Sequence, residues 1–338
     1  MSTTDSRPAD GRAPRRRGAP VRALSLVCLL PLAGTAAEAP LPTCVYVSSY
    51  HRGYSWSDRL EDGLRESVAG RCRLVRTDLD SKRRRAPADI ERAASRALET
   101  IDSVDADVVL VADDNAVKYL VRPHLADGPR PVVFAGVNWT VEEYDLPTPH
   151  VTGMVEVAPI GPMIRQALNA VPGAKVAAYV GASTLTEAKN FERIRAGARR
   201  AGVELVPMYV SDMDGWRTVF EFAQDADFVV IGSFSGIAGW DAAAAAEFAR
   251  AATRRPSFTN HDWMMPVTAF GYTKVPEEHG HWLGASAAAI LDGLDPAEIP
   301  LVTNRKWDIW INEALIEASG THVPASLAYR AKRVGSGV

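Results

Sequence analysis

Short apolar runs alternate with helical stretches along the chain, and this alternation constrains the fold more than any other feature. In the first half it predicts strands over 44–49, 73–77, 107–112 and 131–135, with helices over 56–68, 88–101 and 115–121. Runs this short and unbroken are typical of strands buried on both faces of a parallel sheet. The alternation then restarts, with helices over 159–170, 186–201, 216–223 and 242–252 and strands over 175–180, 204–209, 227–231 and 257–259. Because crossovers of this kind build doubly wound sheets, the sequence predicts two successive α/β units.

The last quarter of the chain does not predict a third domain. It holds helical patterns over 278–291 and 307–319, joined by a Pro- and Gly-rich link over 293–300. We expect these pieces to return and cover the two sheets. Since no low-complexity linker separates the two units, they are expected to face each other across a cleft.

The first 40 residues differ from the rest. A positive block is followed by an apolar run over 23–33, too short to span a bilayer, and then by small residues over 34–37. The block consists of Arg12, Arg15, Arg16, Arg17 and Arg22. This pattern predicts a signal peptide over 1–37, the alternative being a disordered basic tail. Removing it takes away six Arg and two Asp, which leaves a formal charge of −7, and the mature protein is expected to be soluble and periplasmic or secreted.

Composition excludes several classes of protein. Hydrophobic residues make up 47 % of the 338, which argues against a disordered or collagen-like chain. The sequence contains no basic domain, so nothing in it indicates a nucleic-acid partner. Two cysteines remain after export, Cys44 and Cys72, each just before an apolar run. If those runs are adjacent parallel strands the cysteines lie at the same end, and both a disulfide and two buried thiols stay open.

Polar side chains gather where the predicted strands end, which is where open α/β sheets bind ligands. After the first strand, a loop combines hydroxyls and aromatic rings and then enters a helix, whose free N–H groups favour an anion. Comparable small polar groups follow the other strands. The ligand-binding candidates are Ser48, Ser49, Tyr50, His51, Tyr54, Trp56, Asp113, Asp114, Asn115, Asn138, Glu156, Ser183, Ser233, Ser235, Asn260 and Trp263. Such a set suits a small polar ligand held by hydrogen bonds and ring stacking.

Catalytic and cofactor motifs are weak. Phe234 stands where a nucleophile elbow needs serine, and no dinucleotide fingerprint or P-loop is present. The run 277–281 carries two Glu and two His, but an exposed loop that opens a helix is the preferred interpretation over a metal site. The alternative function is a secreted α/β hydrolase. Its one candidate acid–base pair is His51 with Asp113 or Asp114. We therefore expect no enzyme, no cofactor and no metal.

The chain resembles substrate-binding proteins of ABC transporters, in the branch with the type I periplasmic-binding-protein fold. The resemblance rests on the runs 45–51, 113–116 and 131–138, on Gly284 and the run 290–300, and on Asn312, the run 323–327 and Ala331. It implies two doubly wound parallel-sheet lobes joined by a hinge of three crossings, near 152–156, 270–274 and 301–304. The expected lobes are 41–152 with 275–300, and 156–270 with 305–335.

The resemblance also implies a mechanism of binding alone, with closure around one small molecule. Family members that bind amino acids hold the carboxylate with hydroxyls and helix-start amides and the amine with an Asp. Residues matching that scheme are Ser48, Ser49, Ser183, Ser233 and Asp114. The ring-rich first loop departs from it and favours an aromatic or heterocyclic ligand over an aliphatic amino acid. The protein is expected to be a monomer, and its expected partner is an ABC permease or, alternatively, a membrane sensor.

Overall fold

The computed structural model describes residues 40–334, so the predicted signal peptide over 1–37 lies outside the described residues. The described part of the chain forms two sheets, the first in the order β11-β5-β4-β3-β1-β2 with every pair parallel. Its strands are β1 (Thr43–Ser48), β2 (Arg73–Asp78), β3 (Val108–Ala112), β4 (Val132–Asn138), β5 (Val151–Glu156) and β11 (Val302–Thr303). Chain order reverses between β1 and β3, which is the switch point of a doubly wound sheet.

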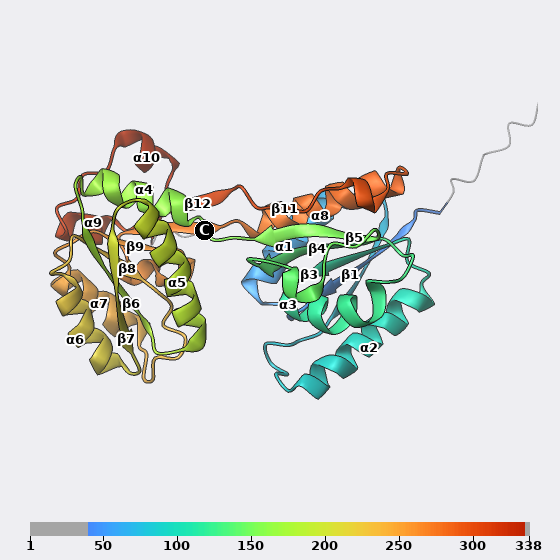
Figure 1. Ribbon diagram of the computed structural model, residues 1–338, viewed down its shortest axis with the longest axis horizontal. Coiled ribbons are helices and arrows are strands. Elements are labelled where there is room, and N and C mark those ends of the chain that lie inside the picture. Colours follow the sequence, from blue (N-terminus) through green and yellow to red (C-terminus); the bar gives the residue numbers. More distant parts are fainter. Residues whose placement is uncertain (1–39, 335–338) are drawn as a thin grey trace, which may run out of the picture. The chain divides into compact units, whose positions relative to one another are not determined.

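Both faces of the first sheet are covered, as its apolar strands require. The covering elements are α1 (Ser55–Val68), α2 (Pro87–Ser103), α3 (Asp113–Ala116), the π-helical run η1 (Val117–Leu125) and α8 (Pro276–Leu291). Alternate residues of β1 enter different cores: Val45 and Val47 pack with α2 and η1, whereas Cys44 and Tyr46 pack with α1 and α8. Figure 1 shows α8 and α2 on opposite sides of this sheet.

The helices α1 and α8 approach each other closely because glycine lines their contact. A Cβ added at Gly280 would lie 1.9 Å from the carbonyl oxygen of Leu60, and one at Gly63 would lie 2.5 Å from that of Glu277. Any side chain at Gly280 therefore pushes the two helices apart. Short 3₁₀ turns η2 (Glu142–Tyr144) and η4 (Pro296–Glu298) complete this part of the chain.

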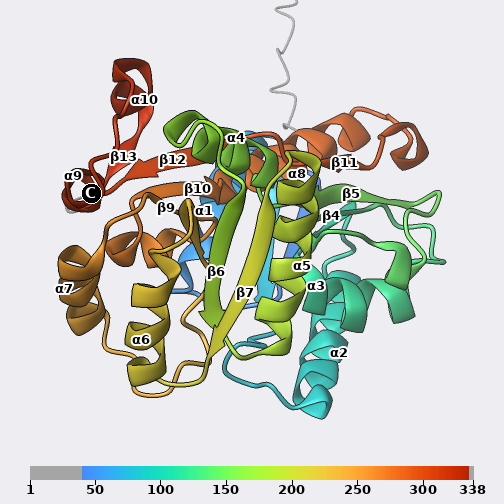
Figure 2. The ribbon, with the colours of Figure 1, turned by 60° about the vertical axis from the view of Figure 1, so that its left-hand side comes forward.

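The second sheet has the order β13-β12-β10-β9-β8-β6-β7, with every pair parallel except β10 with β12. Its strands are β6 (Val176–Ala182), β7 (Glu204–Val210), β8 (Phe228–Ile231), β9 (Ser257–Thr259), β10 (Phe270–Lys274), β12 (Trp307–Ile311) and β13 (Lys332–Arg333). Its helices are α4 (Ile160–Ala170), α5 (Leu185–Arg200), α6 (Met213–Ala223), α7 (Ala242–Ala252), α9 (Glu313–Ala318), α10 (Ala325–Arg330) and the 3₁₀ turn η3 (Asp262–Val267). The switch point lies between β6 and β8, and Figure 2 shows α5 and α6 running beside β6 and β7.

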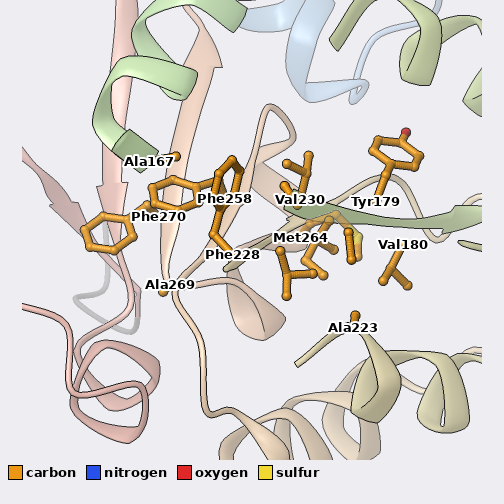
Figure 3. Packing of buried hydrophobic residues seen from close by; sticks show 14 of the residues in the cluster. Ala167, Tyr179, Val180, Ala223, Phe228, Val230, Phe258, Met264, Ala269 and Phe270 are labelled. Atoms are coloured by element: carbon orange, nitrogen blue, oxygen red, sulfur yellow. The ribbon is translucent and has the colours of Figure 1, made fainter. Parts of the chain in front are cut away.

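Aromatic side chains fill the core of the second sheet. Phe258 stacks on Phe270 with ring centroids 5.1 Å apart, and Phe228 meets Phe258 edge-on at 5.7 Å (Figure 3). Offset and edge-on contacts of this kind are the favoured ring geometries. The three rings come from neighbouring strands and bind β8, β9 and β10 into one layer. The predicted α/β class with two doubly wound sheets is confirmed.

The predicted helix over 307–319 is wrong. Residues 307–311 form β12, antiparallel to β10, and the helix α9 begins only at Glu313. Buried Ile309 and Ile311 alternate with Trp310, which is the period of a strand rather than a helix. Asn312 then starts the helix, its side chain accepting a hydrogen bond from the Leu315 amide.

Cys44 and Cys72 form a disulfide, with their Cα atoms 6.0 Å apart. The register of β1 and β2 places Cys44 opposite Leu74, two residues beyond Cys72. The bond therefore joins two adjacent parallel strands at their amino ends. Within residues 40–334, none of the helices is long and apolar enough to span a membrane.

The chain passes between the two sheets three times, after β5, after β10 and after β11. These passages are tied together. The Asn304 side chain accepts from the Val157 amide at 2.7 Å and donates to the Val157 carbonyl at 3.1 Å. Lys274 forms an ion pair with Glu156 and is paired with Trp307 in the antiparallel ladder. The three connecting segments thus lie side by side.

Candidate functional site

The loop after β1 is anchored at the switch point of the first sheet by its serines. Ser49 is buried; its hydroxyl donates to the Ala112 carbonyl at 2.6 Å and accepts from the Ala116 amide at 2.8 Å. Ser48 is also buried and accepts from the Tyr50 amide at 3.3 Å. Ser49 therefore connects β1 to β3 and α3, and its hydroxyl is already hydrogen-bonded within the protein.

Asp113 and Trp56 form the centre of this region. The indole Nε1 of Trp56 donates to Oδ1 of Asp113 at 2.9 Å, and Asp113 is only 3 % exposed. Its second oxygen, Oδ2, has no hydrogen-bond partner among the described residues. Asp113 adopts φ +70°, and Gly136, at φ +79°, lies so close that an added Cβ would be 3.0 Å from Asp113 Oδ1. The packing thus holds a buried carboxylate that is half satisfied.

Two further carboxylates share the neighbourhood. Burial raises the pKa of Asp113 well above its usual range, and the negative charges of Glu156 and Asp114 raise it further. Burial also raises the pKa of Glu156, although Lys274 opposes the shift. The pKa of Asp114 is raised by burial too, against hydrogen bonds from the backbone and side chain of Asn138, the latter at 2.6 Å. The charge of Lys82 opposes the shifts of Asp113 and Glu156, but within residues 40–334 neither Asp113 nor Asp114 forms an ion pair.

Aromatic rings follow on the same loop. Tyr50 and Tyr54 meet edge-on with centroids 5.0 Å apart, and the Lys82 ammonium lies 4.5 and 5.1 Å from them. His51 pairs with Asp80, its Nδ1 lying 3.4 Å from Oδ1, rather than with either acid of the suggested hydrolase pair. Asn115 donates to the Ser81 hydroxyl at 2.8 Å, so its side chain fixes the next loop.

Ser233 occupies the matching switch point of the second sheet. Its amide donates to Oε2 of Glu187 at 3.0 Å, and its hydroxyl accepts from the Ser235 amide at 3.1 Å and the Trp263 indole at 3.3 Å. Glu187 also accepts from the Tyr179 hydroxyl at 2.6 Å, and burial raises its pKa. Glu187 thus orders the loop after β8 from the first turn of α5.

The remaining candidates of this half divide into buried and exposed. Asn260 is buried and donates to Oδ1 of Asn190 at 3.3 Å. Trp263 is 52 % exposed and stacks on His261 with ring centroids 4.6 Å apart. Ser183 and Ser235 are exposed. An indole at the surface, backed by an imidazole and oriented by Ser233, offers a flat apolar face.

Lys274 connects the two sets of residues. Its ammonium pairs with Glu156 and lies 5.3 Å from the centre of the Trp56 ring. Burial lowers the pKa of His261 and of His279 to about 3 each, and the charge of Lys274 adds to both shifts. A single ammonium therefore acts on residues following strands of both sheets.

A second link joins the loop after β4 to α5. The Arg193 guanidinium lies 4.4 Å from the centre of the Trp139 ring, and the charge of Asp114 acts on Arg193, opposing the lowering of its pKa by burial. Sequence reasoning missed these residues together with Lys274, Glu187, Tyr179 and Asn190. Lys274, a cation ending a predicted crossing strand, carried the one local signal that could have found it.

The 277–281 run is not an exposed loop, and that interpretation is wrong. It lies in α8, where His279 is fully buried with its ring centre 5.5 Å from that of Trp56. Glu277 pairs with Arg59, and His281 contacts the Ser67 hydroxyl. The run packs α8 onto α1, and no group of three or more metal-binding side chains occurs among residues 40–334.

Comparisons with known proteins agree with this architecture. Among solved structures, an ABC domain from Streptococcus pneumoniae in complex with L-Trp aligns with a TM-score of 0.60 at 15 % identity, covering 87 % of this chain and 99 % of the other. An open, ligand-free substrate-binding protein with adhesive properties from Clostridium difficile aligns with a TM-score of 0.70 at 13 % identity, over 87 % and 99 %. A periplasmic ribose ABC transporter protein from Conexibacter woesei reaches 0.55 at 13 %, over 88 % and 100 %.

Curated protein sequences contain no significant match to the chain. The model of the family described as ABC transporter substrate binding protein, however, matches residues 62–335. That match covers the whole second sheet, the first sheet from β2 onward and the three passages between the sheets, whereas β1 and the loop after it precede the matched residues. The chain therefore belongs to the family of ABC transporter substrate-binding proteins.

Proposed function

We propose that the protein is an extracytoplasmic solute-binding protein that closes around a small ligand bearing an aromatic ring and a positively charged amine, and delivers it to an ABC importer. Family membership supports binding and transport as the general role. The amino-terminal pattern over 1–37 and the family together support a periplasmic or secreted location. The chemistry of the ligand is argued from the residues at the two switch points.

The observation that carries the proposal is the unpartnered oxygen of Asp113. A buried polar group without a partner costs roughly 1–3 kcal/mol, and more when it is charged. Glu156 and Asp114 add negative charge beside it. Lys274 is already paired with Glu156, and Lys82, whose charge opposes the raised pKa of Asp113, forms no ion pair with it. A ligand amine would supply the missing donor and the missing charge together. An anionic or uncharged ligand would leave the cluster as it is.

Rings on the loop beside this cluster, and one ring after a strand of the second sheet, support an aromatic ligand. Trp56, Tyr50 and Tyr54 follow β1, and half-exposed Trp263 follows β9. Aromatic faces stack on planar ligands and also attract cations. An aromatic amine satisfies both features, and one of the solved structures with this fold is a complex with L-Trp.

Closure follows from the connections between the sheets. Three short passages lie side by side and are tied by Asn304 with Val157 and by Lys274 with Glu156. Such a strap bends while each sheet stays rigid, which is the hinge motion of periplasmic binders. A ligand shifts the balance toward the closed form only through the extra contacts it makes there. Lys274 and Glu156, within the strap and beside the cluster, link ligand charge to hinge geometry.

The test is a thermal-shift and calorimetry screen that separates the amine from the carboxylate. L-tryptophan and tryptamine share the amine, whereas indole-3-acetate keeps the ring and a carboxylate without it, and ribose lacks both. We expect stabilisation by the two amines, about 2.7 kcal/mol at a hundred times Kd, and none by indole-3-acetate. Stabilisation by indole-3-acetate or ribose alone would refute the proposed ligand class.

Variants assign the effect to the cluster. Asp113→Asn and Trp56→Phe are expected to weaken amine binding at least about tenfold, since charge-assisted contacts contribute roughly 1.5–3 kcal/mol. Tyr329→Phe, at a tyrosine that is 91 % exposed on α10, is the matched control and should bind as the parent does. Delivery is tested separately, by asking whether the loaded protein stimulates ATP hydrolysis by a reconstituted ABC importer that contains both permease and ATPase subunits.

A further inference from the structure

Arginines make up four of the eight residues that line a hollow on the first α/β unit. It has a volume of about 320 Å³ and draws on three separate segments: the loop after β1, the end of β2 with the loop after it, and the middle of α2. We call it the arginine hollow. Its walls include Arg52, Arg83, Arg84 and Arg96, with Leu79 and Asp80 between them. Leu79 is fully buried, so it closes the inner end of the hollow.

The acids present do not neutralise these arginines. Three side chains share the Asp80 carboxylate: nitrogen atoms of Arg83, Arg84 and His51 lie 2.7, 3.6 and 3.4 Å from its oxygens. Among residues 40–334, Arg96 makes no ion pair. The hollow therefore holds several guanidinium groups around one shared carboxylate.

Arg52 and Asp78, the remaining charged residues of the lining, do not change this balance. Arg52 reaches Glu61 only at 3.8 Å, and that carboxylate is already engaged by Arg65 and Arg76. Asp78, the second acid of the lining, accepts from Arg76 at 2.7 Å. Both acids are thus committed to the buried guanidinium of Arg76, and the arginines of the hollow keep an excess of positive charge.

The geometry distinguishes this hollow from a second one that also contains arginines. That second hollow, of about 460 Å³, is lined by Arg195, Arg199 and Arg200 with Glu192 and Ala196, all from the single helix α5. Side chains along one helix face point the same way and cannot surround an anion. In the arginine hollow the guanidinium groups come from two separate loops and a helix, and so approach one volume from several directions.

We propose that the arginine hollow binds a small, multiply charged anion of the diphosphate or polycarboxylate class, at a site separate from the proposed amine-ligand site. Guanidinium groups hold phosphate and carboxylate oxygens in pairs of parallel hydrogen bonds. A single exposed ion pair contributes little, so a monoanion gains too little here. An anion that engages Arg83, Arg84 and Arg96 at once gains from several charge-assisted bonds. The inference does not depend on the proposed function.

Isothermal titration of the purified protein with pyrophosphate and with citrate tests the proposal. Ionic strength is held constant with sodium chloride, because screening acts over about 8 Å at 0.15 M. We expect saturable binding of one equivalent of either probe, and much weaker binding of inorganic phosphate. Arg84→Ala and Arg96→Ala should each weaken pyrophosphate binding by about tenfold or more, as expected for losing a charge-assisted contact. Both side chains are exposed, so far-ultraviolet circular dichroism should show intact folding.

Arg199→Ala, from the hollow on α5, is the matched control and should leave the titration unchanged. The proposal fails if sodium chloride of equal ionic strength reproduces the heat, or if Arg199→Ala is the variant that abolishes binding. It also fails if poly-glutamate binds while pyrophosphate and citrate do not, because the surface would then be a docking site for an acidic polypeptide. Loss of amine binding in the same variants is not expected, so the two proposals can be judged separately.

Discussion

Replacing Asp113 by asparagine is expected to stabilise the ligand-free protein at neutral pH while removing its ability to hold an amine. Asparagine has nearly the same shape, tolerates the observed φ of +70°, and keeps an oxygen that accepts from the Trp56 indole. It removes a charge that is 3 % exposed and lies among Glu156 and Asp114. Function and stability should therefore change in opposite directions.

The sign and size follow from the raised pKa of Asp113. Burial lifts its pKa in the folded protein above the value near 3.9 expected in the unfolded chain. The folded state then binds more protons between those two values, so the free energy of unfolding falls as pH rises through the folded-state pKa. Above it, the penalty is complete. At roughly 1–3 kcal/mol for an unsatisfied buried group, the variant should melt roughly 2–12 °C higher at pH values above the folded-state pKa of Asp113.

Urea unfolding and calorimetry over pH 4 to 8 measure the effect, with Asp227→Asn as the matched control. The Asp227 carboxylate accepts from the amides of Lys175 and Val176, which lower its pKa, so asparagine there should reduce stability at neutral pH. The advantage of Asp113→Asn should shrink as pH falls through the raised folded-state pKa of Asp113, because the wild-type carboxyl then becomes neutral. A variant less stable than wild type at pH 7, or a gain that does not depend on pH, would refute the reasoning.

Three further predictions concern the packing around the site. His279→Phe should flatten the acid response, because the pKa of buried His279 is lowered to about 3, and from about 6.5 down to pH 5 its contribution falls by about 2 kcal/mol; equal urea midpoints versus pH in both proteins would contradict this. Gly280→Ala should lower the free energy of unfolding by roughly 1–3 kcal/mol, because the new Cβ would lie 1.9 Å from the Leu60 carbonyl; an unchanged urea midpoint would show that α1 and α8 separate freely. Replacing Cys44 and Cys72 by serine opens a link of sequence separation 28 and should cost roughly 3–4 kcal/mol, measured against the oxidised parent, whereas equal stability would show that the link constrains little.

The sequence determined the two sheets and the edge at which the site lies. Unbroken apolar runs such as 108–111 leave no polar face for solvent, so the strands had to be buried on both sides. The carboxyl ends of parallel strands meet at one edge, so the residues after β1 and β3 could be brought together by reasoning alone. Asp113 and Trp56 do lie in contact there. These conclusions came from patterns among residues that are close together in the sequence.

Only the tertiary structure decided which polar groups are free and which cations lie among them. Ser49 looked like a ligand contact, but its hydroxyl is used between strands 63 residues apart in sequence. Lys274 and Glu156 are 118 residues apart, and nothing near either one indicates the other. The helix predicted over 307–319 became a strand in part because β10 offered an unpaired edge. Hydrogen-bond partners and neighbouring charges depend on which distant segments pack together, and local sequence patterns do not show which segments those are.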